Sequence, residues 1–146
     1  MSRPAASGPS LRLRLIGLLQ APLVRVLGIL RRMDGCVFCR VAEGKAPAQV
    51  LFADDEVVAF HDLHPQAPVH VLVIPRRHVA SLAAAEPADA ELLGRLQLAC
   101  AEAARRTGID GSGYRVVANS GAGAGQSVFH LHYHVLGRRH FSWPPG

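Results

Sequence analysis

The sequence has little of three features that would assign it quickly to a common class. Three cysteines in 146 residues are too few, and odd in number, for the disulfide framework of a small secreted domain. The longest uncharged run of the N-terminal segment, Leu15–Val24, is too short for a membrane-spanning helix of about 20 residues. There is no internal repeat, heptad pattern or low-complexity segment. We therefore expect one globular domain in a reducing compartment, most simply the cytoplasm.

Acidic residues are missing from residues 1–33, which hold six arginines. Subtracting these six from the net charge of +5 leaves −1 for residues 34–146. The basic balance therefore belongs to the N-terminal segment. Residues 34–146 lack the basic excess that is typical of nucleic-acid-binding domains. We expect no specific nucleic-acid binding.

The N-terminal segment, residues 1–33, has three interpretations. Its arginine-rich, acid-free and apolar composition fits a transit peptide, which would place the mature protein in an organelle. The same composition fits a basic helix that lies on a membrane surface, so membrane association is expected only if the segment is retained. Alternatively, translation starts at Met33, and residues 1–32 do not belong to the native protein. In each case the folded domain is residues 34–146.

Patterns along residues 34–146 predict an α+β fold. A short helix is expected over residues 36–44 and a long one over 88–108, with glycines at their C-terminal ends. Apolar, β-branched runs predict strands over 48–55, 56–63, 68–75 and 113–120, and a fifth strand contains the last cluster of histidines. Short turns between neighbouring strands favour a five-stranded antiparallel sheet covered by one main helix.

The segment FHLHYHVLG, residues 129–137, carries His130, His132 and His134 at alternate positions. In a strand, alternate residues face the same way, so the three imidazoles would line one face and the apolar residues between them the other. Random placement of the eight histidines would give this pattern about 0.02 times. The outer two lie roughly 13 Å apart along a strand, so one zinc ion cannot easily bind all three. At least one histidine should have another role.

The loop before these histidines, Asn119–Ser127, contains three glycines and ends in a serine hydroxyl. Glycine lets backbone N–H groups approach an oxyanion closely. No Gly-Lys-Ser/Thr follows, so the loop is not a P-loop. A neutral imidazole, with a reference pKa of about 6.5, can attack with one nitrogen while the other donates its proton to a fixed acceptor. Loop and histidines together predict a phosphate group held beside a nucleophilic histidine.

Cys36 and Cys39 form a Cys-x-x-Cys pair, which is half of a zinc site. His78 and His130 are candidates for the two further ligands. The alternatives are a redox pair or two unpaired thiols, although the βαβ context of thioredoxin-like chemistry is missing. Cys100, within the long predicted helix, is expected to be a buried core residue.

These residues resemble a known family. The run His130–Leu136 is similar to the histidine-triad signature His-φ-His-φ-His-φ-φ, in which φ is apolar. The stretches at residues 60–78 (FHDLHPQAPVHVLVIPRRH) and 113–137 (GYRVVANSGAGAGQSVFHLHYHVLG), with the terminal WPPG, closely resemble the Hint branch of the histidine triad (HIT) superfamily. The resemblance covers nearly all of residues 34–146.

The resemblance implies a HIT-like fold and a homodimer in which two five-stranded sheets join into one. It implies binding of purine nucleotides and hydrolysis of the P–N bond of nucleoside phosphoramidates, the reaction of an adenosine 5′-monophosphoramidase. The reaction would pass through a nucleotidyl-histidine and need no catalytic cofactor. Dinucleoside polyphosphate hydrolysis or nucleotidyl transfer, as in other branches, is an alternative. A nucleotide-binding regulatory or scaffold protein is another.

The resemblance also implies roles for single residues. His132 would be the nucleophile, His134 would contact the phosphate and handle protons, and His70 would orient the nucleophile. Ser127 would lie near the leaving group. The nucleotide contacts implied are Asp62, Leu63, Asn119, Gly125, Gln126, Ser127, His132 and His134.

Related proteins with the cysteine pair carry a structural zinc, which here implies the ligands Cys36, Cys39, His78 and His130. One departure concerns the segment after the triad. This chain has Gly137-Arg138-Arg139-His140, where relatives tend to have Gly-Gly-Arg-Gln. The change adds charge near the C-terminal segment with Trp143, which leaves the preference for a leaving group open.

Overall fold

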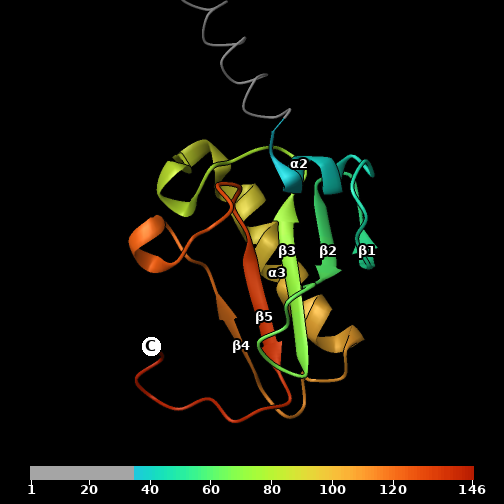
Figure 1. The fold of residues 1–146 in the computed structure, drawn as a ribbon, viewed down its shortest axis with the longest axis vertical. Helices are drawn as coiled ribbons and strands as arrows, with labels where there is room; N and C mark the ends of the chain where they lie inside the picture. The colour runs from blue at the N-terminus through green and yellow to red at the C-terminus, as the bar shows by residue number, and fades with distance from the viewer. Residues whose placement is uncertain (1–34) are drawn as a thin grey trace, which may run out of the picture. The chain divides into compact units, whose positions relative to one another are not determined.

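Five strands form one antiparallel sheet in the order β1-β2-β3-β5-β4 (Figure 1). The computed structural model describes residues 35–146, so the interpretations of the N-terminal segment fall outside the described residues. The strands are β1 (Val50–Ala53), β2 (Val57–His61), β3 (Val69–Pro75), β4 (Tyr114–Val117) and β5 (Tyr133–Gly137). The helices are α2 (Val37–Ala42) and α3 (Ala90–Arg106), with short 3-10 turns at Leu82–Ala84, Pro87–Asp89 and Ala122–Ala124. The predicted α+β fold is confirmed.

The two faces of the sheet carry different helices, because alternate side chains of each strand point to opposite faces. Val69, Val71 and Val73 of β3 belong to the apolar cluster that packs against α3. Leu72 and Ile74 of the same strand belong to a second cluster, built with α2. The described residues form one compact unit, and none of their helices is long and apolar enough to cross a membrane.

Helix α3 lies where the long helix is predicted and covers one face of the sheet with its buried side. Leu96, Ala99, Cys100 and Ala103 are buried. The helix ends at Arg106 with Thr107 as its C-cap, and Gly108 follows with φ +68°. A left-handed residue just after a helix is typically glycine, because a Cβ is strained there.

Strand β5 begins later than the sequence predicts. Its ladder with β3 ends at the pair Val73–Tyr133, so only His134 of the three histidines lies in the strand. If the register continued, Leu131 would face Pro75, which has no N–H to donate. Instead the Leu131 N–H donates to the Val79 carbonyl at 2.6 Å. The predicted alternation nevertheless holds, since Leu131, Tyr133 and Val135 pack in the α3 cluster.

The C-terminal end of β5 is packed too tightly for any side chain. A Cβ on Gly137 would lie 2.6 Å from Cδ1 and 2.9 Å from Cγ2 of Ile109. Ile109 is 0% exposed and belongs to the α3 cluster, so it has little room to move. This close approach fixes how the segment after α3 packs beneath β5.

We expect Gly137→Ala to lower the free energy of unfolding by about 1–3 kcal/mol through overpacking. The matched control is Gly94→Ala, at an exposed position of α3 where a Cβ meets nothing within 4 Å. That change should raise stability by up to about 1 kcal/mol, because alanine favours the helix. Urea unfolding measures both variants. Equal stabilities of Gly137→Ala and wild type would contradict the packing described here.

Candidate active site

A cavity of about 290 Å³ opens on the α2 face of the sheet. Its wall combines apolar side chains from α2, β2 and β3 with polar groups from the loop after β2 and from the histidine segment. The lining residues are Val37, Phe38, Val41, Pro47, Ala48, Phe60, His61, Asp62, Leu63, His64, Leu72, Ser127, Val128, His132 and His134. An apolar cavity with a few convergent polar groups is the usual form of a small-molecule site.

His132 is held in one tautomer. Its Nδ1 lies 2.7 Å from the backbone carbonyl of His130. A carbonyl only accepts hydrogen bonds, so Nδ1 carries the proton and neutral His132 has its lone pair on Nε2. The ring is 5% exposed and lines the cavity. The fixed acceptor that the sequence predicts beside a nucleophilic imidazole is, for His132, a backbone carbonyl.

His70, Asp62 and His134 form a second hydrogen-bonded group. The backbone N–H of Gln66 donates to Nδ1 of His70 at 3.0 Å, so the proton of neutral His70 is on Nε2. This N–H lies 2.8 Å from Nδ1 of His134 and 3.3 Å from Oδ2 of Asp62. Accepting at Nδ1 leaves His134 with its own proton on Nε2. The side chain of His70 thus hydrogen-bonds to His134, and the prediction that His70 orients the nucleophile stays a prediction.

Burial keeps the two imidazoles of this group, His70 and His134, uncharged. It lowers the pKa of His134 to about 4, with the neighbouring His132 and His70 adding to the effect and Asp62 opposing it. Burial also lowers the pKa of His70 against the attraction of the Asp62 carboxylate. At neutral pH both rings are therefore neutral, and His134 can donate a hydrogen bond from Nε2 without carrying charge.

The glycine-rich loop is braced from within. Gln126 is 4% exposed; its Oε1 accepts from Gly121 N–H, and its Nε2 donates to the carbonyls of Ala80 and Val128. Its side chain thus shapes the loop and does not reach the cavity. Of the predicted nucleotide contacts, Asp62, Leu63, Ser127, His132 and His134 line the cavity, whereas Asn119, Gly125 and Gln126 do not.

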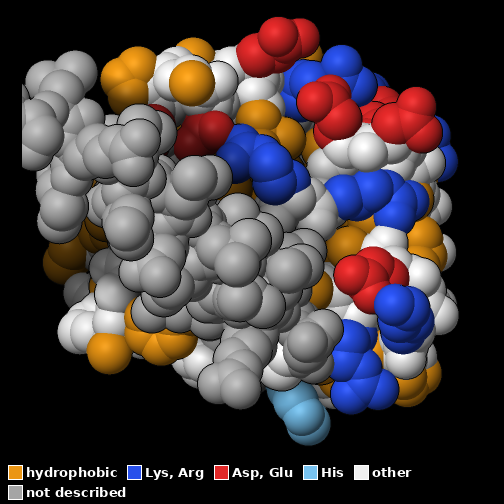
Figure 2. All heavy atoms as spheres, turned by 90° about the horizontal axis from the view of Figure 1, so that it is seen from above, with side chains coloured by type: hydrophobic (Ala, Val, Ile, Leu, Met, Phe, Trp, Pro, Cys, Tyr) orange, Lys and Arg blue, Asp and Glu red, His pale blue; other side chains and the backbone are white. Residues whose placement is uncertain are grey.

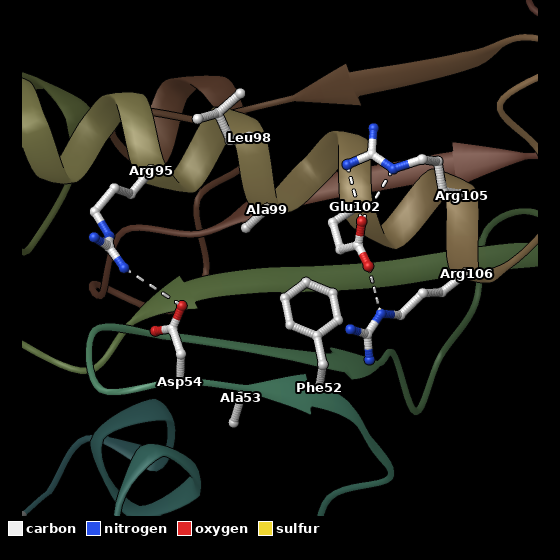
Figure 3. Close-up of a pocket in the computed structure, with 9 residues that line it drawn as sticks. All are labelled: Phe52, Ala53, Asp54, Arg95, Leu98, Ala99, Glu102, Arg105 and Arg106. Atoms are coloured by element: carbon white, nitrogen blue, oxygen red, sulfur yellow. Dashed lines mark hydrogen bonds and ion pairs between the residues drawn. The ribbon is translucent and has the colours of Figure 1, made fainter.

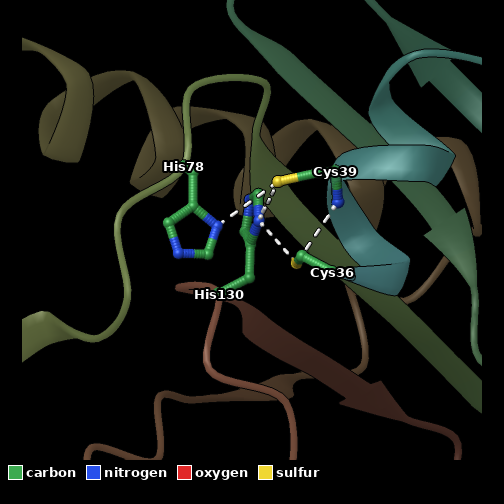
Figure 4. Close-up of side chains that lie close together, drawn as sticks. All are labelled: Cys36, Cys39, His78 and His130. Atoms are coloured by element: carbon green, nitrogen blue, oxygen red, sulfur yellow. Dashed lines mark hydrogen bonds between the residues drawn. The ribbon is translucent and has the colours of Figure 1, made fainter. Parts of the chain in front are cut away.

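The predicted metal ligands converge in a separate cluster beside the cavity (Figure 4). Nδ1 of His130 lies 3.5 Å from Sγ of both Cys36 and Cys39, and Nδ1 of His78 lies 3.3 Å from Sγ of Cys39. A tetrahedral zinc with Zn–S of about 2.3 Å and Zn–N of about 2.05 Å would separate sulfur and nitrogen by roughly 3.5 Å. The donor set and its spacing therefore fit zinc.

The protonation states also fit. Nε2 of His130 donates to the Pro75 carbonyl at 2.8 Å, which leaves Nδ1 unprotonated toward the cysteines. Burial lowers the pKa of His130 to about 4, so the ring is a neutral ligand. Burial, reinforced by Cys36, raises the pKa of Cys39 to about 12. A thiolate at this position needs a cation beside it.

A larger hollow of about 740 Å³ lies on the other side of the sheet, between β1 and α3 (Figure 3). Its charged groups are already paired, since Arg95 contacts Asp54, and Arg105 and Arg106 contact Glu102. It holds no histidine or cysteine. The smaller cavity with the histidines is therefore the better candidate for chemistry.

Basic and acidic side chains lie side by side on the described surface (Figure 2). On the face shown in Figure 2, Lys and Arg side chains lie beside Asp and Glu, and Arg77–Asp89 and Arg95–Glu56 are ion pairs. On the part of this face visible in Figure 2, the Lys and Arg side chains are thus interspersed with acidic ones and form no single basic patch. That the protein does not bind nucleic acid specifically stays a prediction.

Sequence reasoning missed the contribution of α2 to the site. Phe38 contacts the ring of His132 with centroids 5.2 Å apart, and Val37 and Val41 line the same cavity. One signal for this was present: Val37 and Phe38 stand between the two cysteines, and a metal shared with His130 would bring them close to the histidine segment. His61 and His64 also line the cavity.

A sheet that presents alternating histidines beside such a cavity is the architecture of a histidine triad protein. The HIT domain model matches residues 43–141, and the chain belongs to this family. It is 50% identical over 113 residues to an uncharacterized HIT-like protein of Synechocystis, covering 77% of this chain and 98% of that protein.

Solved structures agree in fold. A HIT family hydrolase from Legionella pneumophila is 43% identical, with a TM-score of 0.75, over 77% of this chain and 100% of that one. A zinc-bound histidine triad family protein from Mycobacterium smegmatis is 32% identical, with a TM-score of 0.63, over 78% of this chain and 81% of that one. The five-stranded antiparallel sheet with one long helix is thus the HIT-like fold.

The lowered pKa of His134 predicts how stability depends on pH. Above pH 6.5 the ring is neutral in both folded and unfolded chains. As the pH falls from 6.5 to about 4, the unfolded chain binds a proton that the folded chain resists, so the free energy of unfolding falls. Urea unfolding at pH 7 and pH 5 should show a larger loss for wild type than for His134→Gln. Equal losses would contradict the buried, neutral state of His134.

Proposed function

We propose that this protein is a purine nucleoside phosphoramidase, which hydrolyses the P–N bond of substrates in which AMP is linked to an amine. The observation that carries the proposal is the fixed tautomer of His132, whose Nδ1–H donates to the His130 carbonyl at 2.7 Å. This bond leaves the Nε2 lone pair for attack on phosphorus without any proton transfer beforehand. A HIT family hydrolase of known structure is among the similar proteins.

The reaction has two steps. Nε2 of His132 attacks phosphorus, the P–N bond breaks, and its electron pair leaves with the amine, which takes up a proton. Water then attacks the nucleotidyl-histidine, the bond from phosphorus to Nε2 breaks, and AMP and the free imidazole form. Splitting the hydrolysis in this way replaces one difficult step by two easier ones. No catalytic cofactor enters either step.

In the proposed reaction, the hydrogen-bonded pair of His70 and His134 stabilises charge on the phosphate. His70 Nε2–H donates to His134 Nδ1 at 2.8 Å, and His134 lines the cavity. In our proposal the remaining N–H of His134 donates to a phosphate oxygen as charge develops there. Asp62 accepts the His64 backbone N–H at 2.8 Å, and its Oδ2 lies 3.3 Å from Nε2 of His70. Asp62 therefore holds the hydrogen-bonded pair of His70 and His134 in place. The hydroxyl of Ser127, which lines the cavity, would lie near the leaving amine and direct a proton to it.

The cavity suits a nucleoside. Phe60, Leu63 and Leu72 give it an apolar wall for a flat base, and Asp62 lies beside this wall as an acceptor for ribose hydroxyls. In the proposal, Asn119 and the backbone of Gly125 approach the phosphate from the loop when a nucleotide is bound.

We further propose that Cys36, Cys39, His78 and His130 bind a structural zinc ion. The support is the converging donor set and the zinc-bound relative from Mycobacterium smegmatis. Bound there, zinc would join α2 to the loop after β3 and to the histidine segment. This is a stabilising role, because all four positions of a tetrahedral ion are taken by protein ligands.

A homodimer belongs to the same proposal. β4 ends the order of the sheet and leaves its outer backbone edge without a strand partner among residues 35–146. The opposite edge strand, β1, has an irregular register between Val50 and Phe52, which disfavours further pairing. A second copy joined along β4 would extend the sheet across the dimer. A cytoplasmic location stays a prediction.

The first test is turnover of a fluorogenic adenosine phosphoramidate. His132→Ala should reduce kcat by at least about 1,000-fold, because no other group can form the intermediate. His132→Gly should regain part of the rate when imidazole is added. The control His140→Ala removes an exposed tail histidine and should leave turnover unchanged.

Three outcomes would contradict the proposal. Turnover that survives in His132→Ala would exclude this nucleophile. A wild-type protein that binds AMP without turning over the phosphoramidate would favour a nucleotide-binding regulator, and turnover of a dinucleoside polyphosphate instead would favour the other hydrolase branch.

Metal analysis tests the zinc site. Wild-type protein purified without chelator should contain one zinc ion per chain, and Cys39→Ser should lose it because a thiolate ligand is gone. The matched control is Cys100→Ala, since Cys100 is buried in the α3 cluster away from these ligands. That variant should keep its zinc. A wild-type protein free of zinc would contradict the site.

A further inference from the structure

The short helix α2 touches both the metal cluster and the nucleophile. Cys36 caps its N-terminus and Cys39 lies in its first turns. Phe38, between the two cysteines, packs edge-to-face on His130 and His132, with ring centroids 6.0 Å and 5.2 Å apart. Phe38 is 9% exposed, so these contacts belong to the packed interior. One helix turn therefore connects the cysteines to the ring of His132.

His130 makes a second connection. Its ring nitrogen faces both cysteine sulfurs at 3.5 Å, and its backbone carbonyl accepts the Nδ1–H of His132 at 2.7 Å. The residue is 0% exposed. Whatever fixes the ring of His130 also fixes the carbonyl that selects the tautomer of His132. The two connections meet the same imidazole, one through the ring contact with Phe38 and one at its Nδ1.

Helix α2 cannot hold this position by itself. It has six residues, and isolated helices of that length are unstable in water. Its apolar side chains pack on Val58, Phe60 and Ile74, but its N-terminal end, where Cys36 and Phe38 lie, is fastened by the cysteine–histidine cluster. An ion bound by both cysteines and both histidines would close this end of the helix onto the histidine segment.

We propose that the Cys36–Cys39–His78–His130 site positions the nucleophile as well as stabilising the fold, and that Phe38 is the positioning residue that transmits this from α2 to His132. The proposal rests on the function proposed above. It adds that the orientation and the tautomer of His132 depend on whether the metal site is occupied. Disturbing residues one shell away from the reacting atom typically costs 10–100-fold in activity, so the effect should be large enough to measure.

The first experiment observes His132 directly and needs no substrate. The full chain, labelled with ¹⁵N-histidine, is compared by NMR with zinc bound and after chelation, and His132→Gln identifies the signals of His132. With zinc, His132 should be in the neutral tautomer protonated at Nδ1. Without zinc it should become a mixture of tautomers, while the backbone signals of β3 and β5 show that the sheet remains folded. His132 signals that are the same with zinc bound and after chelation would overturn the proposal.

The second experiment decides the case in which the chelated chain unfolds. Phe38→Leu keeps an apolar side chain and leaves all four metal ligands in place. We expect it to retain zinc, to lower kcat by about 10-fold and to show the mixed tautomer of His132. The matched control is Ala42→Gly, which weakens the same helix at a buried position of the same apolar cluster. It should lose stability but keep kcat and the His132 tautomer.

The outcomes separate the two proposals. If Phe38→Leu keeps its zinc, its kcat and the Nδ1–H tautomer, positioning through α2 is excluded. If Ala42→Gly loses as much kcat as Phe38→Leu, the effect comes from general destabilisation, and the proposal is equally excluded. If His132 responds to zinc but the wild type does not turn over a phosphoramidate, the proposed function fails while the coupling between the metal site and His132 holds.

Discussion

The hydrogen bond from His132 Nδ1 to the His130 carbonyl is the interaction on which the rest of the site depends. It exists because the chain leaves the β3–β5 ladder before it reaches Tyr133. In a regular ladder, the carbonyl of His130 would face a neighbouring strand. Pro75 has no N–H to donate to Leu131, so the pairing with β3 ends at this point. The His130 carbonyl accepts its hydrogen bond from the His132 side chain instead. The interrupted ladder thus accompanies a fixed tautomer of His132, which the proposed nucleophile requires.

The sheet divides stability and chemistry between its two faces. Strand alternation sends Val71 and Val73 into the α3 core and Leu72 to the α2 face, where His70 bonds to the cavity residue His134. The large apolar cluster around α3 can therefore tolerate a polar group of buried imidazoles on the other side. Each of these imidazoles has a hydrogen-bond partner, which is the condition for burying polar groups without a large cost.

Much of this arrangement follows from sequence patterns. Helical spacing located α3, turn residues located the β1–β2 hairpin, and alternation of histidine with apolar residues placed the triad on one face. Spacing could not show where β5 begins, because that depends on Pro75 in a strand distant in sequence. For the same reason it could not show that a backbone carbonyl holds His132, that His70 pairs with His134, or that Gln126 braces its own loop. These contacts arise only when distant segments meet.

The most direct test of the account is the site of nucleotidylation. Wild-type protein produced with ¹⁵N-labelled histidine is mixed with a phosphoramidate, and turnover is stopped with base. The adduct is then located by tandem mass spectrometry and by ¹⁵N–³¹P coupling. The account predicts AMP on Nε2 of His132, because Nδ1 is engaged with the His130 carbonyl. An adduct on Nδ1, on His134 or on no histidine would contradict it.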